Sequence, residues 1–531
     1  MSRAVSLANH LVAAFDEHPS AVVTARAVTS PGRTLLLGVD VGTSGTKVVL
    51  LDADGRAVDE ATVTYDVRSP RPGWTEQDPE SWWDALRDAL GQLWARGNRA
   101  ADVVAVGLSG QMHSLVVLDR EGDVCCPALL WSDNRTGAEC AEITAALGRD
   151  GLLARTGNLA LAGFTAPKIL WVRRHWPDAF ARAAHLLLPK DFIRYRLSGD
   201  VASEMSDASG TLLLDVRARA WAEDVIAELG IDRALLPDVV EGSTVTGVVS
   251  PEAAALTGLV AGTPIVAGGG DNAAAAVGLG ATDPGILTLS VGTSGVIFAP
   301  LERYPDIVDG SLHVFCHALP DRWHLMSVTL AAGGSLHWLR DALAPVLPAA
   351  GEAAYDWLME RAAAAPAGSD GVIFLPYLSG ERTPMADPEA RGAWFGLHLG
   401  TGLDDLVRSV LEGVAFSQRQ GLDLMRAAGA SATIARGAGG GLSSPVWRQI
   451  LADALGVGLQ LAGPGMGAAR GAAVLAGLGV GAYASAGVGV DWAAQPVQGP
   501  DAAGSAALER GFATYAALYP ALAGAFADAA S

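Results

Sequence analysis

The pentapeptide Val-Gly-Thr-Ser-Gly occurs twice in this sequence of 531 residues, at 41–45 and again at 291–295. Each copy lies between two apolar runs, a pattern that predicts a tight turn joining two strands. Glycines in such a turn let the backbone approach an anion closely, while amide and hydroxyl groups donate to its oxygens. The repeat therefore predicts two turns that hold phosphate groups.

Asp40 distinguishes the two copies, because Ser290 occupies the equivalent place before the second. A carboxylate at a strand end beside a phosphate turn can hold magnesium, largely through water, since magnesium keeps much of its hydration. Lys47 could meet a phosphate or be a solvated strand residue. The turn is not a P-loop, because Thr43, five residues after Gly38, stands where that motif requires glycine.

A second acidic candidate, Asp271, follows three glycines and precedes an alanine-rich segment that is predicted to be helical. Aspartate is a favoured N-cap residue, which would explain its presence by local structure alone. Alternatively, the glycines let a substrate hydroxyl approach a carboxylate that accepts its proton. Phosphoryl transfer needs such a base, together with positioned phosphates and a divalent cation. The residues alone leave both interpretations open.

Hydrophobic patterning predicts the elements that must position these groups. Around the first turn it predicts an antiparallel meander of three strands, at 34–39, 47–51 and 57–65. A helix should follow, because Asp78 is a good N-cap and Pro79 suits the first helical position. A further strand at 103–108 then leads into Ser-Gly-Gln-Met-His at 109–113.

The second half of the chain repeats this order, with strands expected at 285–290 and 296–299. The two turns lie 250 positions apart (291 minus 41), about the size of one domain. We therefore expect a duplicated nucleotide-binding lobe. The expected divisions are a flexible N-terminal extension over 1–33, an N-terminal lobe over 34–280, a C-terminal lobe over 281–515 and a tail over 516–531.

Composition narrows the class of protein. A net charge of −20 argues against nucleic acid or an anionic membrane as the main partner. The four cysteines have neither metal-ligand spacing nor the density of a disulfide scaffold, which favours a reducing, cytoplasmic compartment.

The segment 313–317 contains two histidines and a cysteine but alternates like a strand, and the uncharged stretch 471–490 is mostly glycine and alanine. A structural strand and a buried helix are therefore expected there, in place of a metal site and a membrane span.

Many motifs, in order from about Leu35 to Val480, resemble those of the FGGY family of carbohydrate kinases. They include Gly-Val-Asp-Val-Gly-Thr-Ser-Gly at 38–45, Gly-Gln-Met-His at 110–113, Gly-Gly-Gly-Asp-Asn at 268–272 and Gly-Glu-Arg-Thr-Pro at 380–384. Further matches lie at 77–80, 130–133, 163–168, 188–191 and 439–441. The resemblance implies an α/β fold of two actin-like, ribonuclease H-like lobes, with mixed sheets flanked by helices and the active site in the cleft between them.

The resemblance also implies an activity, in which ATP with Mg²⁺ phosphorylates D-xylulose at its 5-hydroxyl. Asp271 matches the proton acceptor, and Asp40 matches the carboxylate near magnesium. The implied sugar contacts are Gln111, Met112, His113, Trp131, Asp133, Asp271 and Asn272. The implied nucleotide contacts are Gly42, Thr43, Ser44, Gly292, Thr293, Ser294, Gly440, Gly441 and Ser444.

Two alternatives to this activity remain open. Ser114 stands where the family usually has glycine, so the sugar could instead be another ketopentose, a deoxyketose or a polyol. A non-enzymatic sugar or nucleotide sensor on the same fold should lack Asp40 or Asp271, and both are present. The expected partners are a small sugar and ATP, with no nucleic acid and no membrane, and the sequence leaves a homodimer open.

Overall fold

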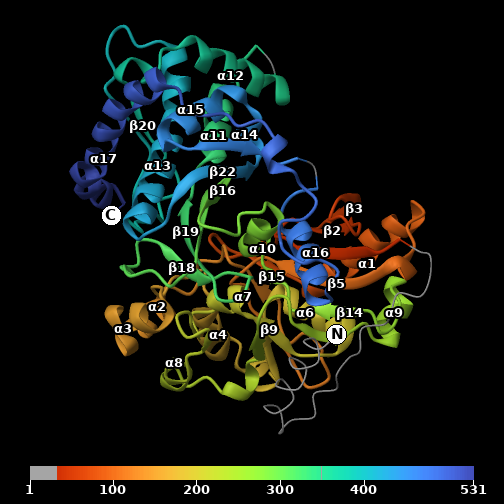
Figure 1. The fold of residues 1–531 in the computed structure, drawn as a ribbon. Helices are drawn as coiled ribbons and strands as arrows, with labels where there is room; N and C mark the ends of the chain where they lie inside the picture. The colour runs from red at the N-terminus through yellow and green to blue at the C-terminus, as the bar shows by residue number, and fades with distance from the viewer. Residues whose placement is uncertain (1–32, 349, 464, 531) are drawn as a thin grey trace, which may run out of the picture. The chain divides into compact units, whose positions relative to one another are not determined.

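The computed structural model describes residues 33–348, 350–463 and 465–530. The predicted N-terminal extension therefore lies outside the described residues, apart from Arg33. Two mixed sheets, with helices packed around them, form the framework (Figure 1).

The first sheet contains the predicted meander, formed by β1 (Leu35–Val41), β2 (Gly45–Leu51) and β3 (Ala57–Thr64). Its order is β13-β14-β5-β1-β2-β3, and the short β15 also pairs with β5. The remaining strands are β5 (Val103–Gly110), β13 (Val245–Val248), β14 (Pro264–Val266) and β15 (Gly269–Gly270). β1 runs parallel to β5 and antiparallel to β2.

The second sheet has the order β18-β19-β17-β16-β22-β23. Its strands are β16 (Gly285–Val291), β17 (Gly295–Leu301), β18 (His313–Cys316), β19 (Trp323–Thr329), β22 (Ala432–Ala438) and β23 (Gly458–Leu461). β16 runs antiparallel to β17 and parallel to β22, as β1 does to β2 and β5. The five strands β3-β2-β1-β5-β14 thus correspond to β19-β17-β16-β22-β23. This correspondence supports the predicted duplication, and β18 confirms the strand expected at 313–317.

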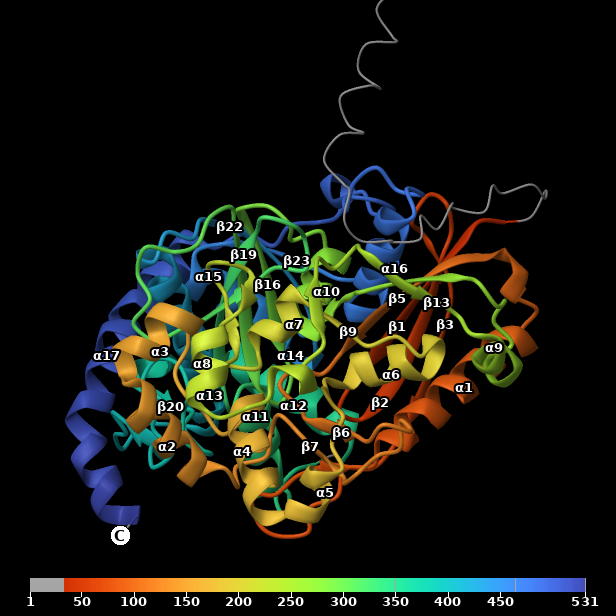
Figure 2. The same cartoon turned by 90° about the horizontal axis from the view of Figure 1, so that it is seen from below.

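Two faces of the first sheet carry different helices. Alternate side chains of β1 separate them, because Leu35, Leu37 and Val39 belong to the cluster that includes α1 (Pro79–Ala95), whereas Leu36 belongs to the cluster that includes α16 (Ala468–Gly479). Figure 2 shows α1 and α16 on opposite sides of these strands. Asp78 accepts a hydrogen bond from the N–H of Glu80, which confirms the predicted N-cap.

The α16 helix packs directly on strand backbones. A Cβ on Gly38 would lie 1.8 Å from the carbonyl oxygen of Ala469, and one on Gly107 would lie 1.9 Å from that of Ala472. Small residues on both partners are what permit this approach. The helix confirms the buried segment expected near 471, but it covers the first sheet although it lies within the range predicted for the C-terminal lobe. Among the described residues, no helix is long and apolar enough to cross a membrane.

The other helices lie around the two sheets. They are α2 (Gly137–Leu147), α3 (Arg149–Thr156), α4 (Thr165–His175), α5 (Pro177–Ala181), α6 (Pro189–Ser198), α7 (Met205–Ser209), α8 (Glu223–Glu228), α9 (Pro251–Thr257), α10 (Asp271–Gly278), α11 (Gly333–Leu343), α12 (Glu352–Ala364), α13 (Leu403–Ala427), α14 (Gly440–Ser443), α15 (Pro445–Leu455) and α17 (Ala502–Ala530). The α17 helix continues through the boundary predicted at 516, because Leu518 and Phe526 are still buried against the core.

Short strands complete the fold. They are β4 (Glu76–Gln77), β6 (Val116–Leu118), β7 (Ala128–Leu129), β8 (His185–Leu187), β9 (Ala202–Glu204), β10 (Leu214–Asp215), β11 (Ala220–Trp221), β12 (Asp238–Val240), β20 (Ile373–Leu375) and β21 (Ala393–Phe395).

Candidate active site

The two predicted acidic residues meet at one edge of the first sheet. Asp40 pairs in register with Ser109 on β5, and Gly269 on β15 pairs with the same Ser109 from the other side. β1, β5 and β15 are parallel, so their carboxyl ends lie at the same edge, where open α/β sheets bind their ligands. Asp271 follows β15 directly, and the sheet therefore brings it towards Asp40.

Each carboxyl group responds to its surroundings. Burial, together with the negative charge of Asp40, raises the pKa of Asp271 to about 7, although two hydrogen bonds from Asn272 oppose both effects. The backbone N–H and Nδ2 of Asn272 donate to Asp271 Oδ1 at 2.7 and 2.9 Å. Burial also raises the pKa of Asp40 to about 6, against the opposing effects of the nearby Ser109 hydroxyl and the charge of Lys47. The raised pKa of each carboxyl group means that it binds a proton, or a cation in its place, more readily near neutral pH than an exposed aspartate does.

The structure removes the purely local explanation of Asp271. The N-cap of α10 is Gly270, and Asp271 is the first residue of the helix; within the described residues its side chain is bonded only to the adjacent Asn272. Capping an N-terminus therefore does not account for an aspartate here. The position of Asp271 instead fits a general base that a substrate hydroxyl approaches past the glycine loop.

Glu204 and Ser206 hold the backbone next to this aspartate, and the sequence analysis did not identify them. The N–H of Gly270 donates to Glu204 Oε1 (3.1 Å) and to Ser206 Oγ (3.0 Å). Glu204 also caps α7 through the N–H groups of Ser206 and Asp207. An acidic N-cap residue before a short helix was the available signal, but the link from Glu204 to Gly270 spans 66 positions and depends on the fold.

Asp40 has the features of a magnesium-binding carboxylate. Its Oδ1 is buried and has no hydrogen-bond partner among the residues that the structure describes. The same residues contain no group of three or more His, Cys, Asp or Glu side chains arranged around a metal position. A magnesium ion would then take its other ligands from water and phosphate, which is how it is usually bound in phosphoryl-transfer sites. Lys47 pairs with Glu60 at 2.9 Å, which favours its interpretation as a strand-surface residue.

The segment that contains Met112 and His113 lies beside the glycine loop. A Cβ on Gly270 would lie 2.8 Å from Met112 Cγ. His113 has a φ of 67°, and its Nδ1 lies 2.8 Å from the carbonyl oxygen of Gly210. Burial lowers the pKa of His113 to about 3, so the ring is neutral. A carbonyl can only accept, so Nδ1 carries the proton and Nε2 is an acceptor suited to a sugar hydroxyl.

Hydrogen bonds of fixed direction join the first turn to this segment. The indole N–H of Trp131 donates to Thr43 Oγ1 (2.9 Å), and Thr43 donates to Gln111 Oε1 (3.1 Å). Gln111 Nε2 donates to Gln77 Oε1 (3.1 Å), which also accepts from the indole of Trp82 (3.0 Å). Indoles only donate, so the two tryptophans set every direction between them. The hydroxyl proton of Thr43 is therefore committed to Gln111, and a donation from Thr43 to phosphate must come from its backbone.

Asp133 and Ser114, which are close in sequence to predicted sugar contacts, both form hydrogen bonds within the protein. Asp133 is fully buried, and its oxygens accept from the N–H of Thr75 (2.6 Å) and from Arg135 (2.7 Å at the shortest contact). Its role as a sugar contact stays a prediction. Ser114 is also buried, and its hydroxyl oxygen accepts the N–H of Trp131 at 3.1 Å. This serine therefore fixes the predicted sugar-lining tryptophan.

The second turn borders a cavity of 1030 Å³. Five predicted nucleotide contacts line it, namely Gly292, Thr293, Gly440, Gly441 and Ser444. Its other wall comes from α11 and α12, including Tyr355 and Met359. The cavity is large enough for a nucleotide. Gly42, Thr43 and Ser44 instead belong to the β1–β2 turn on the first sheet, and Ser294 completes the second turn through its carbonyl oxygen, which accepts from Gly292.

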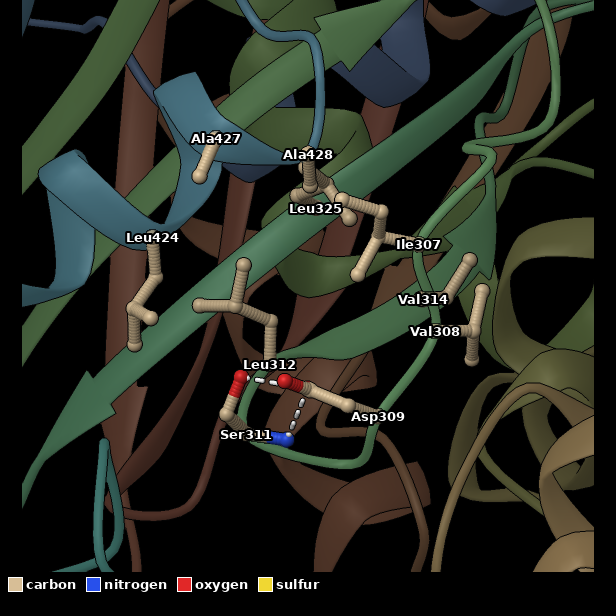
Figure 3. Close-up of a pocket in the computed structure, with 10 residues that line it drawn as sticks. All are labelled: Ile307, Val308, Asp309, Ser311, Leu312, Val314, Leu325, Leu424, Ala427 and Ala428. Carbon is tan, nitrogen blue, oxygen red and sulfur yellow. Dashed lines mark hydrogen bonds between the residues drawn. The ribbon is translucent and has the colours of Figure 1, made fainter.

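A second hollow has no chemistry of this kind. It encloses 50 Å³ between the end of α13 and the second sheet, and leucine side chains such as Leu312, Leu325 and Leu424 line it (Figure 3). Its polar side chains, Asp309 and Ser311, bond to each other. We interpret it as a small packing space in the core.

Comparison with protein families matches most of the described chain, from residue 35 to residue 480. The N-terminal domain of the FGGY family of carbohydrate kinases matches residues 35–278, and the C-terminal domain matches residues 287–480. The xylulose kinase of Escherichia coli (strain K12) is 44% identical over 82% of this chain and 89% of its own length. That of Bacillus subtilis (strain 168) is 38% identical over 85% of this chain and 89% of its own length.

Solved structures agree with this result. A xylulose kinase from Rhodospirillum rubrum superposes with a TM-score of 0.83 at 32% identity, covering 93% of this chain and 99% of that one. A xyloylose kinase from Brucella ovis superposes with a TM-score of 0.85 at 39% identity, covering 92% of this chain and 99% of that one. The expected two-lobed α/β fold is confirmed, and the chain belongs to the FGGY family of carbohydrate kinases.

Proposed function

We propose that this protein transfers the γ-phosphoryl group of ATP to the 5-hydroxyl of D-xylulose, giving D-xylulose 5-phosphate and ADP. The observation that carries the proposal is the meeting of Asp271 and Asp40 at the sheet edge beside Met112 and His113. The names of the E. coli and B. subtilis relatives support xylulose as the sugar.

The reaction needs a proton acceptor for the sugar hydroxyl. Asp271 accepts this proton as the hydroxyl oxygen bonds to the γ-phosphorus and the bond to the ADP oxygen breaks. Asn272 holds Asp271 Oδ1 through two hydrogen bonds, which leaves the other oxygen, Oδ2, to receive the proton. Gly268, with a φ of 87°, allows the loop to pass close to β5, where a Cβ would lie 1.8 Å from Leu108 O.

The nucleotide side is assigned to the second sheet. The cavity beside Gly292, Thr293 and Gly440–Ser443 would hold ATP, with its phosphates directed to the two turns. Mg²⁺ would be held by Asp40 and would spread the charge that develops on the phosphates. The four cysteines are free thiols, which supports the predicted cytoplasmic location. A homodimer stays a prediction.

An ADP-release assay tests the proposal across D-xylulose, L-xylulose, D-ribulose, L-ribulose, glycerol and gluconate. D-xylulose should give the highest kcat/KM of the six. A higher value for any other sugar would replace xylulose in the proposal, and a lack of turnover with all six would overturn it.

A further inference from the structure

The Gly-Glu-Arg-Thr-Pro segment at 380–384 has no role in the site described so far, yet its backbone is fixed. The N–H of Thr383 donates to the carbonyl of Val328 (3.1 Å), and the N–H of Val328 donates back to Thr383 Oγ1 (3.2 Å). Glu381 Oε1 accepts from the N–H groups of Leu330 (2.9 Å) and Arg382 (2.8 Å). The end of β19 therefore holds Arg382 on both sides.

The guanidinium of Arg382 has no partner in the part of the chain that the structure describes. It is half-buried, and none of its nitrogens makes a hydrogen bond or ion pair within residues 33–348, 350–463 and 465–530. The adjacent Glu381 is turned away, towards Leu330 and Ser417. This chain otherwise supplies acceptors to its less exposed arginines, as Arg436 shows with the carbonyls of Leu279 and Gly280. A partly buried cation without protein acceptors needs water or a ligand to supply them.

The guanidinium lies near the predicted sugar contacts Trp131 and His113. A Cβ on Gly163 would lie 3.8 Å from Arg382 Nη2 and 2.9 Å from the carbonyl oxygen of Trp131. The positive charge of Arg382 contributes to the lowered pKa values of His113 and Lys168, so both lie within its field.

Lys168 is a second cation within the field of Arg382. Lys168 Nζ already donates to the carbonyls of His113 (3.2 Å), Gly163 and Phe164 (3.2 Å). The His113 carbonyl also accepts from Thr165 Oγ1 at 2.9 Å. The carbonyls of His113, Gly163 and Phe164 thus already have donors. A ligand that brings oxygen atoms would satisfy the guanidinium.

We propose that Arg382 is a sugar-binding residue contributed by the C-terminal half of the chain. Its guanidinium donates to the carbonyl oxygen on C2 and the hydroxyl on C1, at the end of the ketose opposite to the phosphorylated 5-hydroxyl. The order of neighbours sets this direction, because Asp271 adjoins Gly270, Gly270 contacts Met112, and Met112 leads to His113 near Arg382. The assignment rests on the proposed function.

Arg382→Met tests the proposal, with Arg391→Met as the matched control on the same segment. Arg391 is about half exposed and donates only to neighbours within its own loop. Calorimetric titration of D-xylulose without nucleotide should give a Kd raised about 10- to 100-fold in Arg382→Met, as expected for lost hydrogen bonds to a charged group. Arg382→Lys should recover part of this loss, because it keeps the charge without the planar fork. Arg391→Met should bind as the unmodified protein does.

Two readouts distinguish sugar binding from other roles. The Tm of Arg382→Met should not fall, since the guanidinium makes no hydrogen bond to any described residue. A lowered Tm together with weaker sugar binding would mean a structural role and overturn the proposal. An unchanged sugar Kd with a raised KM for ATP would also overturn it, and would assign Arg382 to phosphate.

A second titration tests which end of the sugar Arg382 holds. 1-Deoxy-D-xylulose lacks the C1 hydroxyl, so the loss caused by Arg382→Met should be smaller for it than for D-xylulose. Equal losses for both sugars would contradict contact with C1. The proposed function fails separately, if the unmodified protein does not phosphorylate D-xylulose at all.

Discussion

The turn between β1 and β2 and the turn between β16 and β17 have the same five residues but different neighbours. In the first turn, Thr43 is hydrogen-bonded to Gln111 and Trp131, two of the predicted sugar contacts. The second is held by α11, where Gly333 donates to the carbonyl of Gly292 (2.7 Å), and it faces the large cavity. Under the proposed function, identical local sequence serves two tasks, and the residues packed around each turn decide which.

Asp271→Asn is expected to have the largest effect. It removes the proposed proton acceptor at the edge of the first sheet, while the asparagine side chain keeps nearly the same size and shape. The kcat should fall by about 100- to 10,000-fold, the usual contribution of a general base. Titration should still show binding of D-xylulose and ATP. A kcat near that of the unmodified protein would contradict the assignment of the base.

Exchanging the residues that precede the two turns tests their asymmetry. Asp40→Ser should lower kcat about 100-fold and raise the Mg²⁺ concentration needed for half-maximal rate, because the carboxylate at the metal is lost. The double variant with Ser290→Asp should stay as slow, since its new carboxylate lies on the other sheet. Recovery in the double variant would show that the two turns are interchangeable.

Matched threonine variants should separate the two turns by substrate. Thr43→Val breaks the hydrogen bonds to Trp131 and Gln111, so it should raise the KM for D-xylulose by about 3- to 10-fold, as a lost neutral hydrogen bond does. Thr293→Val should instead raise the KM for ATP. Steady-state kinetics with each substrate varied in turn measures both. Equal effects of the two variants on both KM values would contradict the division.

The pH dependence should show the smallest effects. Asp271 acts as a base only when ionised, and burial raises its pKa to about 7. The kcat/KM should therefore rise about tenfold per pH unit below pH 7 and level off above it. Asn272→Ala removes a hydrogen bond that lowers this pKa, so the acid limb should move to higher pH. Asp40→Ser removes a charge that raises it, so the limb should move to lower pH. Shifts in the opposite directions would contradict the electrostatic account.

Local pattern was sufficient to predict the strands around each turn, the N-cap at Asp78 and the position of Asp271 at a helix start. These features depend on residues a few positions apart, where periodicity and glycine placement are informative. The residues alone left Asp271 open between an N-cap residue and a general base. The family resemblance was needed to favour the general base.

The long-range partners could not be predicted in the same way. Glu204 acts on Gly270 from 66 positions away, and Trp131 reaches Thr43 from 88 positions away. Such pairs follow from the packing of whole elements. The commitment of the Thr43 hydroxyl to Gln111 also could not be predicted, because it depends on two indole groups that only the fold brings near.

The packing of α16 on the first sheet has a consequence for synthesis of the chain on the ribosome. β1 and β5 are made early, but the helix that covers them begins only at Ala468. The nascent N-terminal half must therefore wait with one apolar face uncovered until most of the polypeptide has been translated. A fragment ending at 280 should accordingly be prone to aggregate, and adding a separate peptide that spans 465–483 should improve its solubility.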